Sequence, residues 1–222
     1  MPWLVVCLLG FAAGLWPEAI VFPKTPRSMV PLPALSALAA AQVVFLLLVY
    51  PVLVLRRAAT PRIPDPESRI PFHFCPGLAV VELVMLLVVA APFSVAAAWF
   101  SDGGAADVLR AALGVAAMIP LSVGLCAWTL PARPPAARCT ALILGLTATA
   151  GLTAGVYLAH EFLRPAWADA LWQTAPVTLA WTCASPQTTP LPIIALTFWL
   201  LTGLASLVGA WMTQPKPVAN SQ

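Results

Sequence analysis

Glu82 is the acidic residue that lies most clearly inside an apolar run of this chain, in the segment GLAVVELVML. An ionised carboxylate in such a run costs free energy unless it is paired, protonated or hydrated. One interpretation is a proton or cation site, or a quinone contact. The other is a structural carboxylate near the membrane surface that binds Arg69, Arg138 or a backbone donor. Both stay open, and Glu82 is the first candidate functional residue.

His160 and Glu161 form a second polar group, in the segment YLAHEFLRP at the end of a later apolar run. Adjacent helical residues point about 100° apart, whereas two metal ligands on one helix need a spacing of three or four residues. The simpler interpretation is a polar helix end in which Glu161 pairs with the arginine one turn later. The alternative is a rim site, shared with Glu18, Asp102 and Asp107, that binds a cation or a basic partner.

His73 and Cys75 stand just before the third apolar run, in PFHFCPG, and Cys139 begins the fifth. Imidazole and thiolate groups are zinc ligands, so these three residues could in principle hold a metal ion. Their spacing matches no metal motif. We therefore expect no metal here, and interpret the cysteines as small packing residues and His73 as an interfacial histidine.

Motifs for several other chemistries are absent from the sequence. It contains no P-loop, no GxSxG and no HExxH segment, and its five cysteines form neither a CxxC pair nor a CxxCH site. No basic stripe is present to follow a phosphate backbone, so we expect no nucleic-acid partner. The two histidines lie at opposite ends of the expected bundle and cannot ligate one haem. We expect no resident cofactor, and leave a lipid or quinone contact open.

The composition indicates a membrane protein. Of the 222 residues, 61% are apolar and only 9% are charged, against roughly a quarter charged in soluble domains. So few charges cannot cover the surface of a soluble fold of this size. The sequence predicts an all-α fold, a polytopic membrane helical bundle that forms one transmembrane domain over residues 1–222.

Six stretches have the length of about 20 residues that a helix needs to cross the hydrocarbon. Prolines at the breaks between them should end the helices, whereas three prolines inside spans should kink them. The first stretch resembles a signal peptide, which would be cleaved, but it has no basic residue before its apolar core, so we expect it to remain as a span. The expected spans are 3–22, 33–55, 77–100, 109–130, 140–162 and 191–212, and the prolines inside them are Pro51, Pro92 and Pro120.

The basic residues near the span ends predict the orientation. Seven of them fall on one side of the membrane and four on the other, and the side richer in Lys and Arg is usually cytoplasmic. This favours an N-in/C-in topology in the plasma or inner membrane. Residues 56–77 then form a cytoplasmic strap. The connection 163–190 is external, and we expect its Trp-rich part, 166–182, to lie flat on the membrane as an amphipathic helix.

Small residues spaced by four suggest how the spans pack. Gly10 and Gly14 form such a pair in the first span, and Gly151 and Gly155 form another in the fifth. Each pair lies on one helical face and allows another helix to approach closely. We expect these faces to make contacts within the chain or with a partner subunit.

The scarcity of catalytic groups, the short loops and the small-residue faces together favour one function. We expect a non-catalytic integral membrane subunit that anchors or shapes a larger redox or transport complex, with other membrane subunits and the lipid bilayer as its partners. The first alternative is a small six-helix transporter whose path uses Glu82. The second is a membrane enzyme with a site at the outer rim near His160.

Overall fold

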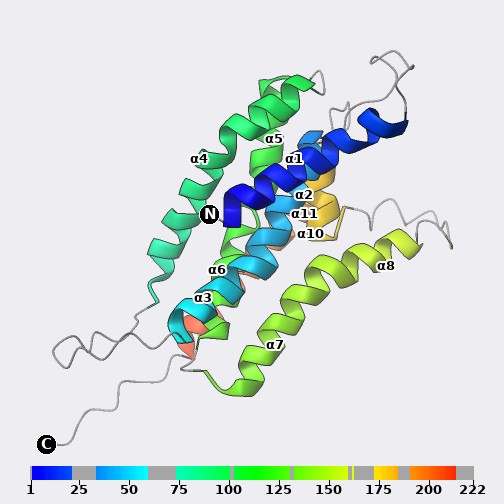
Figure 1. Cartoon of the computed structure of the whole chain (residues 1–222). Helices are drawn as coiled ribbons and strands as arrows, with labels where there is room; N and C mark the ends of the chain where they lie inside the picture. The colour runs from blue at the N-terminus through cyan, green and yellow to red at the C-terminus, as the bar shows by residue number, and fades with distance from the viewer. Residues whose placement is uncertain are drawn as a thin grey trace, which may run out of the picture.

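The computed structural model is a bundle of long helices (Figure 1). It describes residues 2–21, 34–59, 74–100, 103–130, 133–159, 162, 173–184 and 191–213. These ranges contain helices and turns and no strand. The predicted all-helical fold is therefore confirmed within these ranges.

Five helices of the described chain are long and apolar enough to cross a membrane. Their bounds are Ala34–Ala58, Pro76–Phe100, Ala105–Thr129, Pro135–Leu158 and Ile193–Met212. Each corresponds to one expected span, from the second to the sixth. The structure thus has the composition and lengths of a multi-pass membrane protein.

Three of the five long helices consist of shorter elements, α4 and α11 are continuous, and two further helices accompany them in the described chain. In chain order the elements are α1 (Pro2–Val21), α2 (Ala34–Val44), the π-helix η2 (Phe45–Val49), α3 (Tyr50–Ala59), α4 (Pro76–Phe100), α5 (Ala105–Ala116), α6 (Ile119–Thr129), α7 (Pro135–Leu146), the π-helix η3 (Thr147–Gly151), α8 (Leu152–Leu158), α10 (Pro176–Ala184) and α11 (Ile193–Met212). We call the end of the bundle at which α3 ends and α4 begins the Arg57 end, and the opposite end, at which α5 begins, the Asp107 end.

Prolines mark the starts of four helices. Pro2, Pro76, Pro135 and Pro176 are the first residues of α1, α4, α7 and α10. A proline fits the first turn because its missing N–H would have no partner inside the helix there. Of the prolines expected to kink spans, Pro92 lies within an α4 that stays helical throughout, whereas Pro120 follows a break between α5 and α6.

Pro51 has a specific effect on the backbone of the second span. In η2 the N–H of Tyr50 bonds to the carbonyl of Phe45, five residues earlier. The next bond of this kind would join Pro51 to Leu46, but proline has no N–H. The hydroxyl of Ser122 in α6 donates to the Leu46 carbonyl instead, at 2.6 Å. A neighbouring helix thus satisfies the carbonyl that the proline leaves open, as apolar surroundings require.

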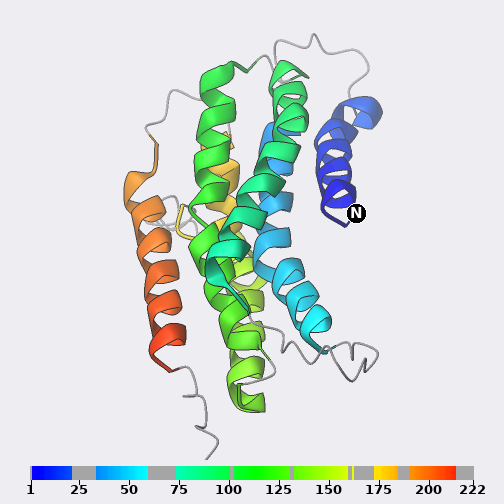
Figure 2. The same cartoon turned by 90° about the vertical axis from the view of Figure 1, so that its left-hand side faces the viewer.

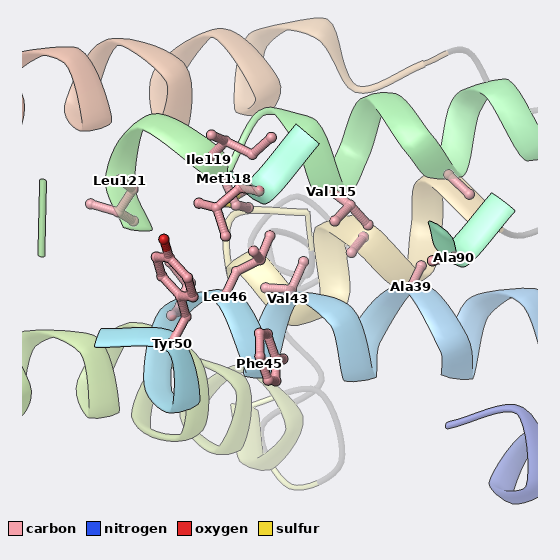
Figure 3. Close-up of a cluster of buried hydrophobic side chains, with 14 of the residues drawn as sticks. Ala39, Val43, Phe45, Leu46, Tyr50, Ala90, Val115, Met118, Ile119 and Leu121 are labelled. Atoms are coloured by element: carbon pink, nitrogen blue, oxygen red, sulfur yellow. The ribbon is translucent and has the colours of Figure 1, made fainter. Parts of the chain in front are cut away.

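The second span is the centre of the hydrophobic core (Figure 3). Its Val43 and Leu46 lie opposite Val115 and Met118 at the junction of α5 and α6 (Figure 3). All four side chains are fully buried. In contrast, α4 and α11 bury few of their residues and present long apolar faces outward, as lipid-facing helices do.

The first helix, α1 (Pro2–Val21), covers almost the same residues as the first expected span. Within it, Pro2–Ala13 is the apolar part whose side chains are described. A sixth membrane crossing stays a prediction. The indole N–H of Trp3 donates to the carbonyl of Leu86, near the middle of α4, at 2.8 Å. At the other end, the ring of Phe11 lies 5.9 Å from that of Phe100, the last residue of α4. This part of α1 therefore lies along only the half of α4 nearest the Asp107 end.

The expectation that segment 166–182 lies flat on the membrane is wrong for its described part. Helix α10 packs between α2 and α5, and most of its residues are buried. A Cβ on Gly114 of α5 would lie 3.0 Å from the Cβ of Cys183, so the two helices are in close contact. The physical reason is that the sequence PVTLAWTCA has no charged face, and a helix that is apolar all round is buried.

Helix α11 holds the start of this re-entrant segment in place. The indole N–H of Trp199 donates to the carbonyl of Thr174 at 2.7 Å. Thr174 lies in the turn just before α10, and a partly buried backbone carbonyl needs a donor, which α11 supplies here. The segment enters the bundle and is fixed there by contacts with four of the long helices.

The tightest helix crossing joins α6 and α11, which lie side by side. A Cβ on Gly124 would lie 2.5 Å from the hydroxyl oxygen of Ser206, and one on Gly203 would overlap the backbone of Leu121. The indole N–H of Trp128 also donates to the carbonyl of Ser206 at 3.2 Å. Figure 2 shows α11, drawn in orange and red, along one edge of the bundle.

Arg133 secures the end of α11 at the Arg57 end of the bundle. Its guanidinium donates to the carbonyls of Ala210 and Thr213 and, at 2.9 Å, to the Thr213 hydroxyl. It also lies 4.9 Å from the centre of the Trp128 ring, in a cation–π contact. The last carbonyls of a helix have no partner inside it, so this buried arginine acts as a cap supplied from another part of the chain.

Candidate functional site

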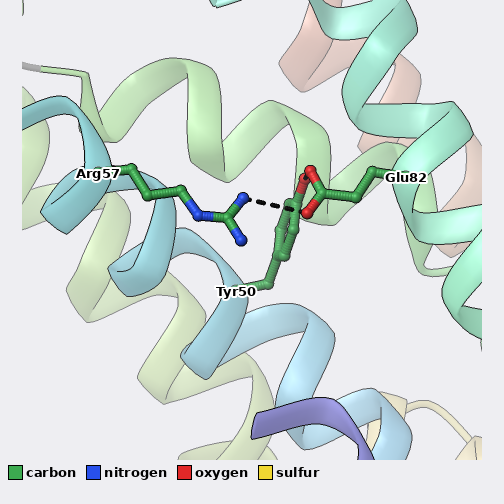
Figure 4. A network of polar contacts seen from close by, with 3 residues as sticks. All are labelled: Tyr50, Arg57 and Glu82. Carbon is green, nitrogen blue, oxygen red and sulfur yellow. Dashed lines mark hydrogen bonds and ion pairs between the residues drawn. The ribbon is translucent and has the colours of Figure 1, made fainter. Parts of the chain in front are cut away.

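Glu82 joins two side chains of the second span in a polar network near the Arg57 end (Figure 4). The hydroxyl of Tyr50 donates to Glu82 Oε2 at 2.9 Å. Nη1 of Arg57 donates to Glu82 Oε1 at 3.0 Å and forms an ion pair with it. Tyr50 and Arg57 are two helical turns apart, so both project from one face of α3. Each oxygen of the carboxylate therefore has a donor from the same helix.

Burial changes sharply across this network. Tyr50 is only 2% exposed, whereas the side chains of Glu82 and Arg57 are 41% and 59% exposed. The phenol fixes the carboxylate from inside the bundle, and the guanidinium approaches it from the accessible side. Glu82 also lies only about 9 Å along α4 from its first residue, at 1.5 Å per residue. This position, with a cation beside it, lowers the cost of a charge in a spanning helix.

This geometry limits what Glu82 can do chemically. Both carboxylate oxygens already accept a hydrogen bond, so a cation or proton that binds Glu82 must share the carboxylate with Arg57 and Tyr50. As it stands, the network ties the end of α3 to the start of α4. Helix α6 lies beside the network. It packs against α3 and carries the fully buried Cys126 near Tyr50.

The sequence identified Glu82 but not its partners. The structural interpretation named Arg69, which lies outside the described residues, or Arg138, which lies in the first turn of α7. The partner is instead Arg57. Tyr50 is not among the partners that the sequence predicts for Glu82, although its spacing of seven residues from Arg57 places the two on one helical face. That spacing is the sequence signal for a shared polar partner on a neighbouring helix.

The other candidate polar residues lie outside the described part of the chain. This applies to His73, His160 and Glu161, so the helix-end, rim and zinc interpretations stay predictions. Cys75 and Cys139 are described, and both are exposed. Within the described residues, no group of three His, Cys, Asp or Glu side chains is close enough to hold a metal ion.

The glycines predicted to pack helices differ in their surroundings. A Cβ on Gly10 would lie 2.7 Å from the Cβ of Ala41, so α1 closely approaches α2 there. Nothing is described of the surroundings of Gly14. A Cβ on Gly151 would contact only Thr147, which belongs to the same span. In the described chain no atom lies within 4 Å of the position that a Cβ of Gly155 would take.

The close approach of the fifth span to the bundle occurs at another glycine. A Cβ on Gly145 in α7 would lie 2.9 Å from the carbonyl oxygen of Leu47, in the π-helix of the second span. Gly145 thus brings α7 against the bundle. Beyond it, η3 and α8 continue as an arm along one edge (Figure 1), where the Gly151–Gly155 face does not form the expected crossing within the described chain.

The chain matches no protein-family model, no curated protein and no solved structure.

Proposed function

We propose that this protein is a non-catalytic integral membrane subunit of a larger assembly in the plasma or inner membrane. In this proposal the chain crosses the membrane six times with both ends in the cytoplasm, and the arm formed by η3 and α8 packs against a helix of another subunit. The observation that carries the proposal is the Gly151–Gly155 face. Within the described residues this face has no neighbouring helix, whereas neighbouring helices fill the Cβ positions of other glycines.

The contrast with the other glycines supports this use of the arm. At Gly10, Gly114, Gly124, Gly145 and Gly203, a Cβ would come within 3.0 Å of an atom of another helix. Small residues in membrane helices favour close approach of a second helix. A glycine face that contacts only lipid gives no packing advantage, because acyl chains contact larger side chains equally well. The open face of α8 is therefore the part of the bundle best suited to a partner helix.

The state of Glu82 is also consistent with a structural role. Its carboxylate is bound by Tyr50 and Arg57, which join α3 to α4. The guanidinium of Arg133 likewise donates hydrogen bonds to carbonyls at the end of α11. These buried or half-buried polar groups stabilise the scaffold of the bundle, as expected for a subunit that shapes an assembly.

Purification of the tagged chain in mild detergent, followed by mass spectrometry of the co-purifying proteins, tests this proposal. We expect other membrane polypeptides to co-purify with the wild type and to be lost in the Gly155→Ile variant. The matched control is Ala205→Ile, which enlarges an exposed position of α11 and should keep the partners. A wild-type chain that is stable, monodisperse and free of other polypeptides contradicts the proposal, as does full retention of partners by Gly155→Ile.

A transporter is the second candidate function, and the re-entrant α10 favours it. Short helices that enter a bundle, together with irregular backbone at membrane depth, often line transport sites. A path through Glu82 would share the carboxylate with Arg57 and Tyr50. Reconstituted liposomes with an internal pH-sensitive dye can detect such a proton path. A proton flux that disappears in Glu82→Gln would favour the transporter, and no flux above that of empty liposomes would exclude Glu82 from a proton path.

A further inference from the structure

A second polar feature lies away from Glu82, in a cavity between α2, α4 and α5. Its volume is about 60 Å³. Most of the wall is apolar, and the polar side chains that line it are Gln42 from α2 and Ser94 from α4. Alanines of all three helices leave the space open, since a larger side chain at Ala39, Ala91 or Ala111 would reach into it.

Gln42 is one of the most deeply buried polar side chains described, at 4% exposure. It forms a side-chain hydrogen bond with the thiol of Cys7, which is fully buried in α1. A carboxamide has two N–H donors and an oxygen with two acceptor positions, and a thiol is a weak partner that engages one of them. The cavity beside Gln42 is where further partners for this amide can be placed.

Ser94 supplies a second polar group to the same cavity. Its hydroxyl donates to the carbonyl of Ala90, one turn earlier in α4, at 3.4 Å. A hydroxyl also has two acceptor lone pairs, which this bond does not use. A polar molecule in the cavity can therefore donate to Ser94 while it bonds to the amide of Gln42.

We propose that this cavity is an internal hydration site, in which water molecules bind Gln42 and Ser94. A cavity holds one water molecule when it offers about 10–15 Å³ accessible to the centre of a water-sized sphere, and two or more polar partners. At about 60 Å³ the space fits more than one water. Apolar cavities of similar depth stay dry, so the polar side chains decide the occupant. The site takes water or a polar solute of comparable size, and it is too small for a lipid or a quinone head group.

X-ray footprinting of the full-length protein in detergent tests this site. The beam makes hydroxyl radicals from water in place, so a buried side chain is modified when ordered water lies beside it. We expect modification of Cys7 and of Leu35, which lines the cavity although it is only 2% exposed. Leu46 is the internal control, because it is equally buried in the adjoining η2 but does not line the cavity.

Two variants separate bound water from transient opening of the bundle. Gln42→Leu removes the main polar group, and we expect the modification of Cys7 and Leu35 to fall to the level of Leu46. Ser94→Ala, an exchange of small side chains, should lower it in part and provides the test if Gln42→Leu does not fold. Equal modification of Leu35 and Leu46 in the wild type would overturn the proposal. Unchanged modification in a folded variant that lacks both polar groups would overturn it as well.

Discussion

The α6–α11 pair and the arm formed by η3 and α8 are built from similar residues but pack differently. Both contain glycines and hydroxyl side chains at helical spacing. In the pair, Gly124 and Gly203 bring the two helices into contact, whereas in the arm no described residue of another helix reaches the Cβ position of Gly155. The comparison teaches that a small-residue pattern marks a face able to pack, but does not tell whether the partner belongs to the same chain.

The hydrogen bonds follow the same division. Between α6 and α11, Trp128 donates across the interface to Ser206, and Arg133 caps the end of α11. In the arm, the Thr149 hydroxyl donates to the carbonyl of Gly145 at 2.8 Å and that of Thr153 to the carbonyl of Thr149. The hydroxyl groups of the arm thus bond within their own helix. A partner helix would therefore contact the arm by van der Waals packing and not by hydrogen bonds.

The largest effect is expected from filling the two glycine faces with the same side chain. Gly203→Leu should destabilise the isolated chain by about 3 kcal/mol or more, because the new side chain overlaps the backbone of α6, which cannot rotate away. Gly155→Leu should change the stability by less than about 0.5 kcal/mol. Unfolding in mixed detergent micelles measures both. Equal destabilisation by the two variants would remove the distinction between the pair and the arm.

The cap on α11 should have the next largest effect. Arg133→Ala leaves the carbonyls of Ala210 and Thr213 without their buried donor, and we expect a loss of about 1–3 kcal/mol. Arg133→Lys should recover part of it, since an ammonium can bond to one of these carbonyls but cannot reproduce the planar fork. The same unfolding assay applies. A neutral Arg133→Ala would show that the end of α11 needs no cap.

The network at Glu82 allows a finer comparison within one site. Tyr50→Phe removes a buried hydrogen bond to a charged group and should cost about 1.5–3 kcal/mol. Arg57→Gln removes an ion pair whose partners are both partly exposed, and should cost less than about 1 kcal/mol. The unfolding free energies of the two variants give this order. The reverse order would mean that the ion pair, and not the phenol, fixes the carboxylate.

The smallest effects concern single hydroxyl groups. Ser122→Ala removes the donor to the Leu46 carbonyl that Pro51 leaves open, and we expect a loss of about 1 kcal/mol. Thr153→Val removes a bond within the arm's own helix and should be close to neutral. Amide hydrogen exchange near η2 should increase only in Ser122→Ala. Increased exchange in both variants would contradict the difference between shared and self-satisfied hydroxyls.

The five long helices could be predicted because their apolar runs are long enough to admit one interpretation. The burial of α10 could not, since nine uncharged residues that include Trp181 and two threonines fit an interfacial helix as well as a buried one. Only the space between α2 and α5 distinguishes the two. The position of α1 along α4 could not be predicted for a similar reason, because it depends on the contact of Trp3 with Leu86.

At the polar network, the sequence predicted that Glu82 needs a cationic partner but not which arginine supplies it. Which arginine faces Glu82 depends on the rotation of α3 about its axis. The packing of α3 against α6 and the π-helix η2 set this rotation. The i, i+7 spacing of Tyr50 and Arg57 was the available signal. The identity of the glycine that joins the fifth span to the bundle, Gly145 and not Gly151, depends likewise on where the π-helix of the second span exposes the Leu47 carbonyl.

The central claim is that the open face of α8 belongs to an interface with another protein. A diazirine amino acid of aliphatic size placed at Gly155 in native membranes, and at Ala205 as the lipid-facing comparison, tests it most directly. On illumination we expect position 155 to form an adduct with a second polypeptide and position 205 to react with lipid. Lipid adducts alone at both positions would contradict the claim.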